Sequence, residues 1–402
     1  MKNLETLINE LCPEGVEFVK LGDVFDLFSG MSKVSNKWAE SGNCKFIDYL
    51  NIYNNLNVDV TKLQNATVAS FKQNVLAQGD ILFTCASETP RECAISAVIR
   101  EPIAKNTFLD DHLNGIRVKE ECKERVNPAF VNYYFYSPKF RVAICKIVRG
   151  VTRFYIVNKN FLKIEIPLPP IEVQTEIVRI LDKFTSLEAE LEAELDCRKR
   201  QYEYYRDKLL SFDNVGGQEV EWKKMNEVCV NCDSKRKAVT GAKRESGNIP
   251  YYGASGIVDY VKDYIFDGDY LLVSEDGANL LARNTPIAFS IKGKNWVNNH
   301  AHVLKFDNLT SQKFVEYYLN SICLSTWISG AAQPKLNQEN LNRIPIPIPP
   351  LAEQQRIVSI LDRFESLTTS LQSGLPAEIA ARRQQYEHYR DKLLTFKRKG
   401  AA

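Results

Sequence analysis

The feature that most constrains this chain is a long helical segment that occurs twice. The stretches PPIEVQTEIVRILDKF (169–184) and PPLAEQQRIVSILDRF (349–364) share nine of sixteen residues, and RKRQYEYYRDKLLSF (198–212) and RRQQYEHYRDKLLTF (382–396) share eleven of fifteen. Each copy follows a proline-rich lead, IEIPLPP or IPIPIPP. Because proline removes a backbone donor and fixes φ, each lead should end the preceding domain in an extended segment and start a helix.

Apolar residues recur three or four positions apart in both copies, which is the spacing of one face of a helix. They are Ile177, Ile180, Phe184, Leu187, Leu191 and Leu195 in the first copy, and Ile357, Ile360, Phe364, Leu367, Leu371 and Ile379 in the second. The second copy is interrupted at SGLP, where Gly374 and Pro376 should break or kink the helix. A long helix with a single apolar stripe needs a partner, so the two copies are expected to pack against each other.

The intervals between the helices read as mixed α/β domains. GDILFTCAS and GDYLLVSEDG are typical of strand-to-loop units, whereas PAFVNYYFYSPKF and SQKFVEYYLNSI are typical of helices. The intervals are weakly duplicated too, since GVEFVKLGDV (15–24) parallels EVEWKKMNEV (219–228). The predicted organisation is a first α/β domain (1–168), a central helix (169–213), a second α/β domain (214–348), a C-terminal helix (349–396) and a tail (397–402).

The totals narrow the class of protein without naming a function. The chain of 402 residues has room for two or three domains, and its formal net charge is +2. Its ten cysteines are scattered without a repeated spacing, which favours reduced thiols over a disulfide framework. No apolar run has the length of a membrane helix, and the first residues lack the apolar core of a signal peptide. These features predict a cytosolic protein, and any nucleic-acid partner would require positive charge gathered on one face.

The order of elements, the tetrad run LEAELEAEL (187–195) and the twin segments QYEYYRDKLLSF and QYEHYRDKLLTF closely resemble the specificity subunit of type I restriction–modification systems. The tetrad run and GLPAEI are similar to the type IC branch. The resemblance spans almost the whole chain and is strongest in the helices. It implies an α+β fold in which two α/β target-recognition domains are separated by two long antiparallel coiled-coil helices, as a pseudo-twofold internal repeat.

The resemblance also implies the function, partners and cofactors. Each α/β domain would read one half of a bipartite, asymmetric site in double-stranded DNA, while the helices would act as a spacer that docks two methyltransferase subunits. Restriction (motor–nuclease) subunits would join for cleavage. This chain would bind no cofactor itself: S-adenosylmethionine would belong to the partner methyltransferase subunit, and ATP and magnesium to the partner restriction subunit. The setting would be a bacterial or archaeal cytoplasm.

Several fragments resemble catalytic or metal motifs, but a structural role is favoured for each. NPAF (127–130) differs by one residue from the NPPF tetrad of amino-methyltransferases, and an N-cap followed by proline explains it better. EWK (221–223) has a nuclease-like spacing but is better explained as the start of a strand. Cys229 and Cys232 form a single CxxC without a second ligand pair, and His300 with His302 suits packing or hydrogen bonding. No phosphate-binding GxxxxGK[ST] loop occurs, so no catalytic residue and no metal ligand is predicted.

DNA contacts are expected from basic, polar and aromatic residues on loops, since these side chains bind phosphates and base edges. In the first domain the candidates are Lys33, Lys37, Ser87, Thr89, Arg91, Arg149, Thr152 and Arg153. In the second domain the basic loop SKRKAVTGAKR (234–244) leads, and the candidates are Lys235, Arg236, Lys237, Lys243, Arg244, Tyr251, Tyr252, Ser255, Arg283, Asn284, Gln333 and Lys335.

Two other classes of function each fit part of the sequence. A self-sufficient DNA methyltransferase or endonuclease would need a catalytic signature, and none is found in the sequence. A non-catalytic coiled-coil scaffold would explain the helices but would leave the basic, glycine-punctuated loops of two divergent domains without a role. A binding assay with randomised duplex DNA discriminates, because a scaffold would enrich no sequence and an enzyme would be active without partners.

Overall fold

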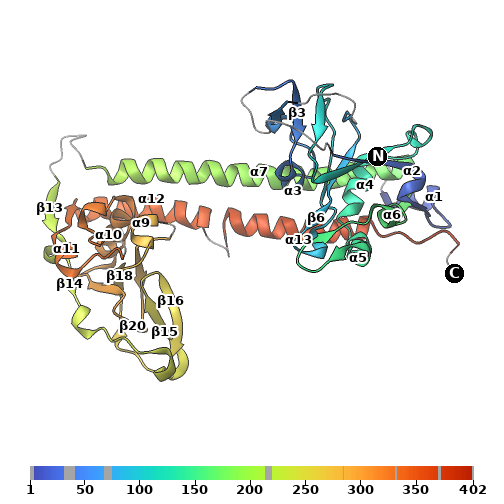
Figure 1. Ribbon diagram of the computed structural model, residues 1–402. Helices are drawn as coiled ribbons and strands as arrows, with labels where there is room; N and C mark the ends of the chain where they lie inside the picture. The colour runs from blue at the N-terminus through green and yellow to red at the C-terminus, as the bar shows by residue number, and fades with distance from the viewer. Residues whose placement is uncertain are drawn as a thin grey trace. The chain divides into compact units, whose positions relative to one another are not determined.

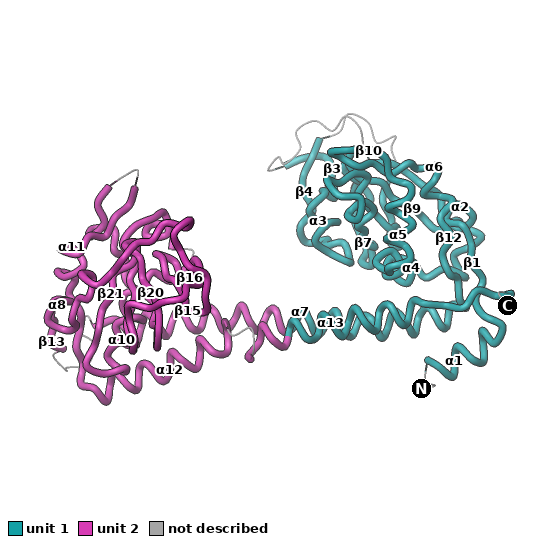
Figure 2. The backbone as a smooth tube through the Cα atoms, turned by 90° about the horizontal axis from the view of Figure 1, so that it is seen from below, with its two compact units in different colours: residues 1–190, 379–402 teal, residues 191–378 magenta. Residues whose placement is uncertain are grey.

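Figure 1 and Figure 2 show the computed structural model of the chain, which describes residues 4–30, 41–67, 75–212, 220–283, 285–330, 333–369 and 373–400. The chain divides into two compact units, coloured separately in Figure 2: unit 1 contains residues 1–190 and 379–402, and unit 2 contains residues 191–378. Within the described ranges, no helix has the length and apolar character that crossing a membrane requires. Four residues of interest lie outside the described residues: Lys33, Lys37, Asn284 and Leu371.

Unit 1 is built around a four-stranded antiparallel sheet in the order β2 (Phe25–Ser29), β9 (Leu113–Val118), β5 (Ile81–Thr84) and β7 (Ser96–Val98). Every residue of β5 and β7 is buried, as expected for short apolar strands in a core. In a second sheet the central strand pairs antiparallel with one neighbour and parallel with the other, in the order β4 (Gln64–Ala66), β3 (Cys44–Ile47) and β8 (Thr107–Leu109). Two smaller sheets are β1 (Glu17–Lys20) with β12 (Glu165–Leu168), and β10 (Arg149–Gly150), β11 (Phe154–Tyr155) and β6 (Ala86–Ser87).

Helices cover this framework. They are α1 (Leu4–Leu11), α2 (Leu21–Val24), α3 (Tyr49–Asn54), α4 (Pro128–Phe135), α5 (Pro138–Ile147) and α6 (Asn158–Phe161), with 3-10 turns at Val60–Lys62, Pro90–Glu92 and Glu120–Cys122. Asn127 caps α4 by accepting hydrogen bonds from the amides of Ala129 and Phe130. The prediction that NPAF starts a helix is therefore confirmed. Phe135 and Phe140 stack with their ring centres 4.1 Å apart, which joins α4 to α5 in the core.

Unit 2 repeats this framework. Its antiparallel sheet has the order β14 (Val230–Asn231), β21 (Ala301–Lys305), β18 (Tyr270–Ser274) and β19 (Ala288–Ile291). Its second sheet has the order β16 (Gly256–Val261), β15 (Ser246–Gly253), β20 (Lys294–Val297) and β17 (Phe266–Asp267). A two-stranded sheet joins β13 (Glu221–Lys224) to β22 (Pro345–Ile348). The helices are α8 (Met225–Val228), α9 (Asn279–Ala282), α10 (Leu309–Ser321) and α11 (Gln338–Arg343), with 3-10 turns at Asp233–Lys235, Gly241–Lys243 and Ser325–Trp327.

The correspondence between the units extends to strand register. In unit 1 Leu82 lies opposite Gly115 and Phe83 opposite Asn114, while in unit 2 Leu272 lies opposite Val303 and Val273 opposite His302. Likewise β3 pairs antiparallel with β4 and parallel with β8, just as β15 pairs with β16 and β20. The weak sequence duplication of the two intervals therefore reflects two copies of one domain topology.

Three long helices carry the duplicated segments: α7 (Ile171–Leu210), α12 (Leu351–Thr369) and α13 (Leu375–Leu393). The prediction of a break at Gly374 and Pro376 is confirmed, since α12 ends at Thr369 and α13 begins at Leu375. Gly374 has φ +83°, and an added Cβ would lie 2.6 Å from the carbonyl oxygen of Ser366. Only glycine fits this left-handed, closely approached position.

Each unit contains the same helix-to-helix contacts, made by opposite copies of the repeat. In unit 1 Phe184 of α7 stacks on Tyr389 of α13, with ring centres 5.4 Å apart. In unit 2 Phe364 of α12 stacks on Tyr205 of α7 at 5.7 Å. Glu188 also forms an ion pair with Arg383. The contact partner on α13 thus has a lower residue number as the residue number on α7 increases, so the two helices pack antiparallel within unit 1. The start of each long helical copy therefore packs against the end of the other copy.

The ends of the helical copies enter the cores in matching ways. Phe396, after α13, packs edge-on against Phe130 in unit 1 at 6.2 Å, and Phe212, after α7, packs edge-on against Phe314 in unit 2 at 6.0 Å. Among the predicted packing residues of the stripe, three are buried: Ile177, Ile357 and Ile379. Seven are half-buried: Ile180, Phe184, Leu187, Leu191, Leu195, Ile360 and Phe364. Leu367 differs because it is 37% exposed, while its neighbour Thr368 is buried at the end of α12.

Candidate nucleic-acid interface

In unit 1 the fold brings together two candidate segments that are far apart in the sequence. Strand β11 pairs with β10 on one side and with β6 on the other, placing Phe154 opposite Ser87. The loop at 149–153 therefore lies beside the loop at 87–92. The three candidates on the first loop are all exposed: Arg149, Thr152 and Arg153. Two arginines on a short hairpin can reach phosphates or base edges of a duplex.

The loop after β6 is held from beneath by Arg141 of α5. Its guanidinium donates to three backbone carbonyls within 2.8–3.2 Å, those of Arg91, Cys93 and Ala94. Burial lowers the pKa of Arg141 to about 10, so the side chain still carries its charge at neutral pH. This loop is consequently a fixed part of the domain.

The candidates on this loop divide into outward and inward residues. Thr89 and Arg91 are exposed, but Ser87 is buried and its hydroxyl donates to Glu92 at 2.9 Å. Hydrogen bonds from Ser87, Thr89 and Tyr53 hold the pKa of Glu92 below its ordinary value. Ser87 therefore organises the loop, whereas Thr89 and Arg91 face solvent.

Two exposed aromatic residues beside these loops were missed from sequence. Tyr155 in β11 is 52% exposed, and Tyr53 in α3 is 37% exposed and reaches Glu92 at 3.3 Å. Val151, at the tip of the β10–β11 hairpin, is 90% exposed. Exposed aromatic rings can stack on bases. The two-residue strands here are too short for an alternation pattern that would have shown which side chains point outward.

In unit 2 the basic loop 234–244 is pinned at several points. The indole of Trp296 donates to the carbonyl of Lys237 at 2.6 Å, and the amide of Val239 donates to the hydroxyl of Tyr251 at 3.0 Å. The guanidinium of Arg244 lies 4.2 Å from the ring centre of Tyr251. A loop fixed by such contacts can present charged side chains in defined positions.

The exposed cations of this loop border a pocket of ≈ 450 Å³ whose basic and aromatic lining includes Lys237, Lys243, Arg244, Lys262 and Trp296. Arg244 pairs with Asp259 at 2.9 Å, and that hydrogen bond raises its pKa. Lys235, Lys237 and Lys243 are exposed, and within the described ranges none of the three takes part in an ion pair. These three lysines are therefore available to phosphates, while Arg244 chiefly shapes the pocket.

The β15–β16 hairpin next to this pocket exposes apolar and aromatic side chains. Ile257, Val258 and Tyr260 on β16 are 47%, 57% and 50% exposed. The exposed Ser255 lies in the turn, followed by Gly256 with φ +124°. Because β16 is the edge strand of its sheet, its exposed side chains and those of the turn can reach base edges or phosphates of a duplex. Sequence reasoning selected Ser255 but missed the exposed residues of β16.

Two tyrosines that were candidates for DNA contact belong largely to the interior. Tyr251 is 1% exposed and stacks on Trp296 at 6.5 Å. Tyr252 is half-buried and packs near Phe289 at 6.1 Å. Their positions on β15 support the hairpin and the basic loop rather than presenting rings to a ligand.

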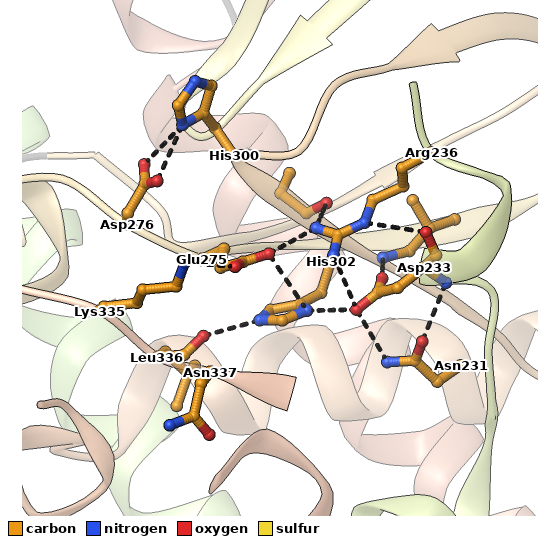
Figure 3. Close-up of polar contacts among 12 residues, drawn as sticks. Asn231, Asp233, Arg236, Glu275, Asp276, His300, His302, Lys335, Leu336 and Asn337 are labelled. Carbon is orange, nitrogen blue, oxygen red and sulfur yellow. Dashed lines mark hydrogen bonds and ion pairs between the residues drawn. The ribbon is translucent and has the colours of Figure 1, made fainter. Parts of the chain in front are cut away.

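The Arg236 side chain also points inward, into the network drawn in Figure 3. Its guanidinium donates to Glu275 at 2.6 Å and to the carbonyl of Ala301 at 2.8 Å, and it lies 3.3 Å from Asp233. The side chain of Arg236 is 13% exposed, that of Glu275 10% and that of Asp233 5%. Arg236 is thus occupied by internal partners, unlike the lysines on either side of it.

His302 lies at the centre of this network and is fully buried. One ring nitrogen is 2.6 Å from an oxygen of Asp233, and the other is 2.7 Å from the carbonyl oxygen of Leu336. Since both partners are acceptors, both nitrogens must donate, and His302 is the imidazolium cation. Burial alone would raise the pKa of Asp233, but the hydrogen bond and charge of His302 hold it below the ordinary value.

The loop around Lys335 is tied to the same network. Lys335 lies 3.0 Å from Glu275, and the pKa of Glu275 stays low despite its burial because Arg236 and Lys335 donate to it. Backbone bonds pair Lys335 with Ser329. Gln333 and Lys335 are both exposed on this loop, so Lys335 can serve the network and a ligand.

Arg283 has a structural role. Its guanidinium donates to the carbonyls of Leu319 and Ile322 at the end of α10, at 3.4 and 2.6 Å. Its backbone is left-handed, with φ +53°. A basic side chain at a helix C-terminus satisfies free carbonyls and the helix dipole, so the Arg283 guanidinium is already used.

His300 and the CxxC cysteines make local contacts. His300 is exposed and pairs with Asp276 at 2.8 Å, forming a polar surface feature at the end of β18 (Figure 3). The thiol of Cys229 donates to the carbonyl of Met225 at 3.3 Å, and burial raises its pKa to about 12. In the part of the chain that the structure describes, no three histidine, cysteine or acidic side chains are arranged to hold a metal ion.

Comparison with known proteins agrees with the duplicated architecture. The model of the type I restriction modification DNA specificity domain matches twice, over residues 13–196 and 218–381. The chain is 30% identical over 372 residues to the EcoprrI specificity subunit of Escherichia coli, covering 89% of both chains. It is 37% identical over 273 residues to the EcoR124I/EcoR124II specificity subunit of Escherichia coli, covering 61% of this chain and 66% of that protein.

A putative type I specificity subunit of Haemophilus influenzae is 43% identical over 184 residues, where the match spans 45% of this chain and about half of that protein, 47%. Among solved structures, the type I S subunit from M. genitalium has a TM-score of 0.56 at 15% identity, covering 94% of this chain and 96% of that one. The HsdS subunit from Thermoanaerobacter tengcongensis has a TM-score of 0.50 at 17% identity, with coverage of 96% and 97%. These structural likenesses establish a shared fold. Together with the two domain matches and the near-full-length relative, they show that the chain belongs to the family of type I restriction–modification specificity subunits.

Proposed function

We propose that this protein is the DNA-recognition subunit of a type I restriction–modification complex, in which each α/β domain reads one half of a bipartite, asymmetric site. The observation that carries the proposal is the pairing of one topology with two different surfaces. The four-stranded sheets β2-β9-β5-β7 and β14-β21-β18-β19 share their order and central register, yet unit 1 exposes an arginine hairpin and unit 2 exposes lysines beside the apolar residues of β16. Two copies of a single reader with unlike contact residues suit an asymmetric site.

In this proposal the exposed cations have a positioning role on DNA. Arg149, Arg153, Lys237 and Lys243 would bind phosphates, which fixes register without reading sequence. The exposed residues of the β15–β16 hairpin, with Gln333 and Lys335 on a neighbouring loop, would approach base edges. Arg236, Tyr251 and Arg283 are left out of the proposed contact set because internal partners occupy them.

Chemistry would be supplied by partner subunits. Two methyltransferase subunits would bring S-adenosylmethionine, and restriction subunits would bring ATP and magnesium, in a bacterial or archaeal cytoplasm. Membership of the type I specificity-subunit family supports the assignment to such a complex. The chain itself would be non-catalytic, so the isolated subunit should neither methylate nor cleave DNA when those cofactors are added.

Exchange of one reader tests the proposal most directly. Residues 214–348 would be replaced by the matching domain of a relative with a different specificity, and methylated positions would be mapped in DNA of a host that carries the cognate methyltransferase. One half of the recognised site should change and the other should stay the same, because each reader has its own sheets and core.

The reciprocal exchange of residues 1–168 is the matched control and should change only the other half. If either exchange altered both halves, the modular assignment would fail. Methylation or cleavage by the purified chain without partners would instead favour a self-sufficient enzyme. Binding without any sequence preference would favour a scaffold.

A further inference from the structure

In both units a buried tyrosine of the reader reaches an aspartate on the long helix beside it. In unit 1 the hydroxyl of Tyr133 on α4 donates to Asp182 of α7 at 2.7 Å. In unit 2 the hydroxyl of Tyr317 on α10 donates to Asp362 of α12 at 2.6 Å. The aspartates stand in the duplicated ILDKF and ILDRF segments, and both tyrosines are at most 3% exposed.

A cation of the reader lies near each contact, and in unit 1 it binds the aspartate itself. Arg100 binds Asp182 through two nitrogens at 2.8 and 3.0 Å. In unit 2 the cation is Lys313, 3.6 Å from Glu365, whose carboxylate also lies 2.8 Å from the Tyr317 hydroxyl. Burial and the hydrogen bond to the carboxylate raise the pKa of each tyrosine, so both hydroxyls remain donors at neutral pH.

A buried glutamine makes a second attachment near the start of each helix. The side-chain oxygen of Gln174 accepts from the amide of Asn127 at 2.8 Å, and its nitrogen donates to the carbonyl of Pro169 at 2.6 Å. Gln354 accepts from the Ser311 hydroxyl at 2.8 Å and donates to the carbonyl of Pro349 at 2.8 Å. Each glutamine therefore links its proline-rich lead and its long helix to the start of a reader helix, at the N-cap of α4 in unit 1 and in the first turn of α10 in unit 2.

The two attachments in each unit lie eight residues apart on the long helix. That spacing is roughly 12 Å of rise and about 80° of net turn at 3.6 residues per turn. Two directional contacts at different heights and on different sides resist both rotation and sliding, whereas apolar packing between them is non-directional. We propose that these contacts are orientation clamps. Gln174, Tyr133 and Asp182 in unit 1, and Gln354, Tyr317 and Asp362 in unit 2, are positioning residues that fix how each reader is turned about its own helix.

The consequence, which rests on the proposed function, concerns the gap between the two half-sites. B-form DNA turns by roughly 35° for each base pair, so a reader that can turn about its helix can accept a gap one base pair longer or shorter. The clamps thus set the strictness of the gap, while the surface loops set the bases. None of the clamp residues is among the proposed DNA contacts.

The test measures gap preference with the chain and its methyltransferase subunits together. The natural site is first read from methylated positions in host DNA, and duplexes are then made with the same half-sites and the gap lengthened or shortened by one or two base pairs. For Tyr133→Phe and Tyr317→Phe, the ratio of methylation at the natural gap to that at neighbouring gaps should fall by roughly tenfold or more, the loss expected for one hydrogen bond to a charged group. The bases recognised in each half-site should not change.

Tyr134→Phe is the matched control, because Tyr134 is equally buried on the same helix and its hydroxyl has no hydrogen-bond partner among the described residues. It should keep the parental ratio. Gln354→Leu provides a second, independent clamp variant and should also relax the gap. An unchanged ratio in the folded clamp variants, or equal loss at every gap, would overturn the inference while leaving the proposed function intact. A parent complex with no preference for a bipartite site would overturn the proposed function and the inference with it.

Discussion

At equivalent positions of their central sheets, the two units use different side chains to bond a strand to a neighbouring segment. His302 in unit 2 and Asn114 in unit 1 occupy equivalent register positions on the strand next to β18 or β5. His302 bonds to the carbonyl of Leu336, just before α11, and Asn114 donates to Asn158, the first residue of α6, at 3.0 Å. Both contacts tie the central strand to the short helix that precedes a proline-rich lead.

The difference lies in charge. Around His302, unit 2 gathers an imidazolium, a guanidinium and two carboxylates in its interior. At the corresponding place in unit 1, Asn114 makes a neutral amide contact, and Cys85 stands where unit 2 has Glu275. Burial raises the pKa of Cys85 to about 12, so this thiol stays uncharged. The same sheet arrangement therefore accepts either a charged or a neutral contact at this point, provided that buried charges are paired.

The largest expected effect is on stability, and it comes from removing the side-chain contacts of His302 and of Asn114. His302→Ala would leave two buried carboxylates short of positive charge and should lower the free energy of unfolding of unit 2 by roughly 3–5 kcal/mol. Asn114→Ala removes a neutral bond and should lower that of unit 1 by roughly 1–3 kcal/mol. Hydrogen exchange followed by mass spectrometry, read separately over each unit, would measure both. Equal losses would remove the distinction between a charged and a neutral contact.

The next largest effect is a difference between the two units in how acid changes their free energies of unfolding. The pKa values of Asp233 and Glu275 are lowered in the folded state, so their contribution to stability is present above the ordinary values of 3.8 and 4.5 and is lost as pH falls below them. Unit 2 should therefore lose unfolding free energy as the pH falls from 5 to 3, because its two buried carboxylates take up protons and lose their ionic partners.

In unit 1 the carboxylates with lowered pKa values lie near the surface, as Asp59 and Glu92 do, so its acid-dependent loss should be smaller. Urea unfolding at a series of pH values, followed by hydrogen exchange in each unit, makes the comparison. The difference between the two units in their acid-dependent loss of unfolding free energy should become smaller in His302→Ala. It should stay the same in Asn114→Ala. A steeper loss in unit 1 would contradict the assignment of the buried carboxylates.

Substitution of the exposed cations should have the smallest effect on stability but a clear effect on DNA binding. Lys237→Ala with Lys243→Ala in unit 2, and Arg149→Ala with Arg153→Ala in unit 1, remove exposed cations and should leave unfolding within about 0.5 kcal/mol of the parent. Each pair should reduce the slope of log affinity against log salt by about two, because each lost phosphate contact contributes about 0.9.

Arg236→Ala is the internal control for that prediction. It lies between two of the lysines in sequence but belongs to the buried network, so it should destabilise unit 2 and leave the salt slope unchanged under conditions where the protein is folded. The binding of fluorescent duplex over a range of salt concentrations gives the slope. A reduced slope in the folded Arg236 variant would place its charge at the DNA instead.

The sequence alone predicted the repeat well because its signals are local. Helix periodicity, the proline-rich leads, the cap at Asn127 and the break at Gly374 each depend on neighbouring residues, and all are confirmed. Sequence also selected loops that the structure places on the surface, such as 149–153. Within those loops it could not separate outward from inward side chains. Arg236 and Lys237 are adjacent and chemically alike, but only Arg236 has a carboxylate 39 residues away pointing at it.

What the sequence determined by itself is therefore the plan of the molecule: two readers, two long helical copies and membership of a family with that plan. Residue type and spacing suffice for this, because helix periodicity and turn chemistry act over a few residues. The tertiary structure alone decided which helix copy packs in which unit, which cations are free, and which buried pairs fasten reader to helix. Phe184 meets Tyr389, Tyr133 meets Asp182 and His302 meets Leu336 only after the chain has folded. Partners so distant in sequence are selected by packing and by the cost of leaving buried polar groups without hydrogen bonds, and neither leaves a local pattern.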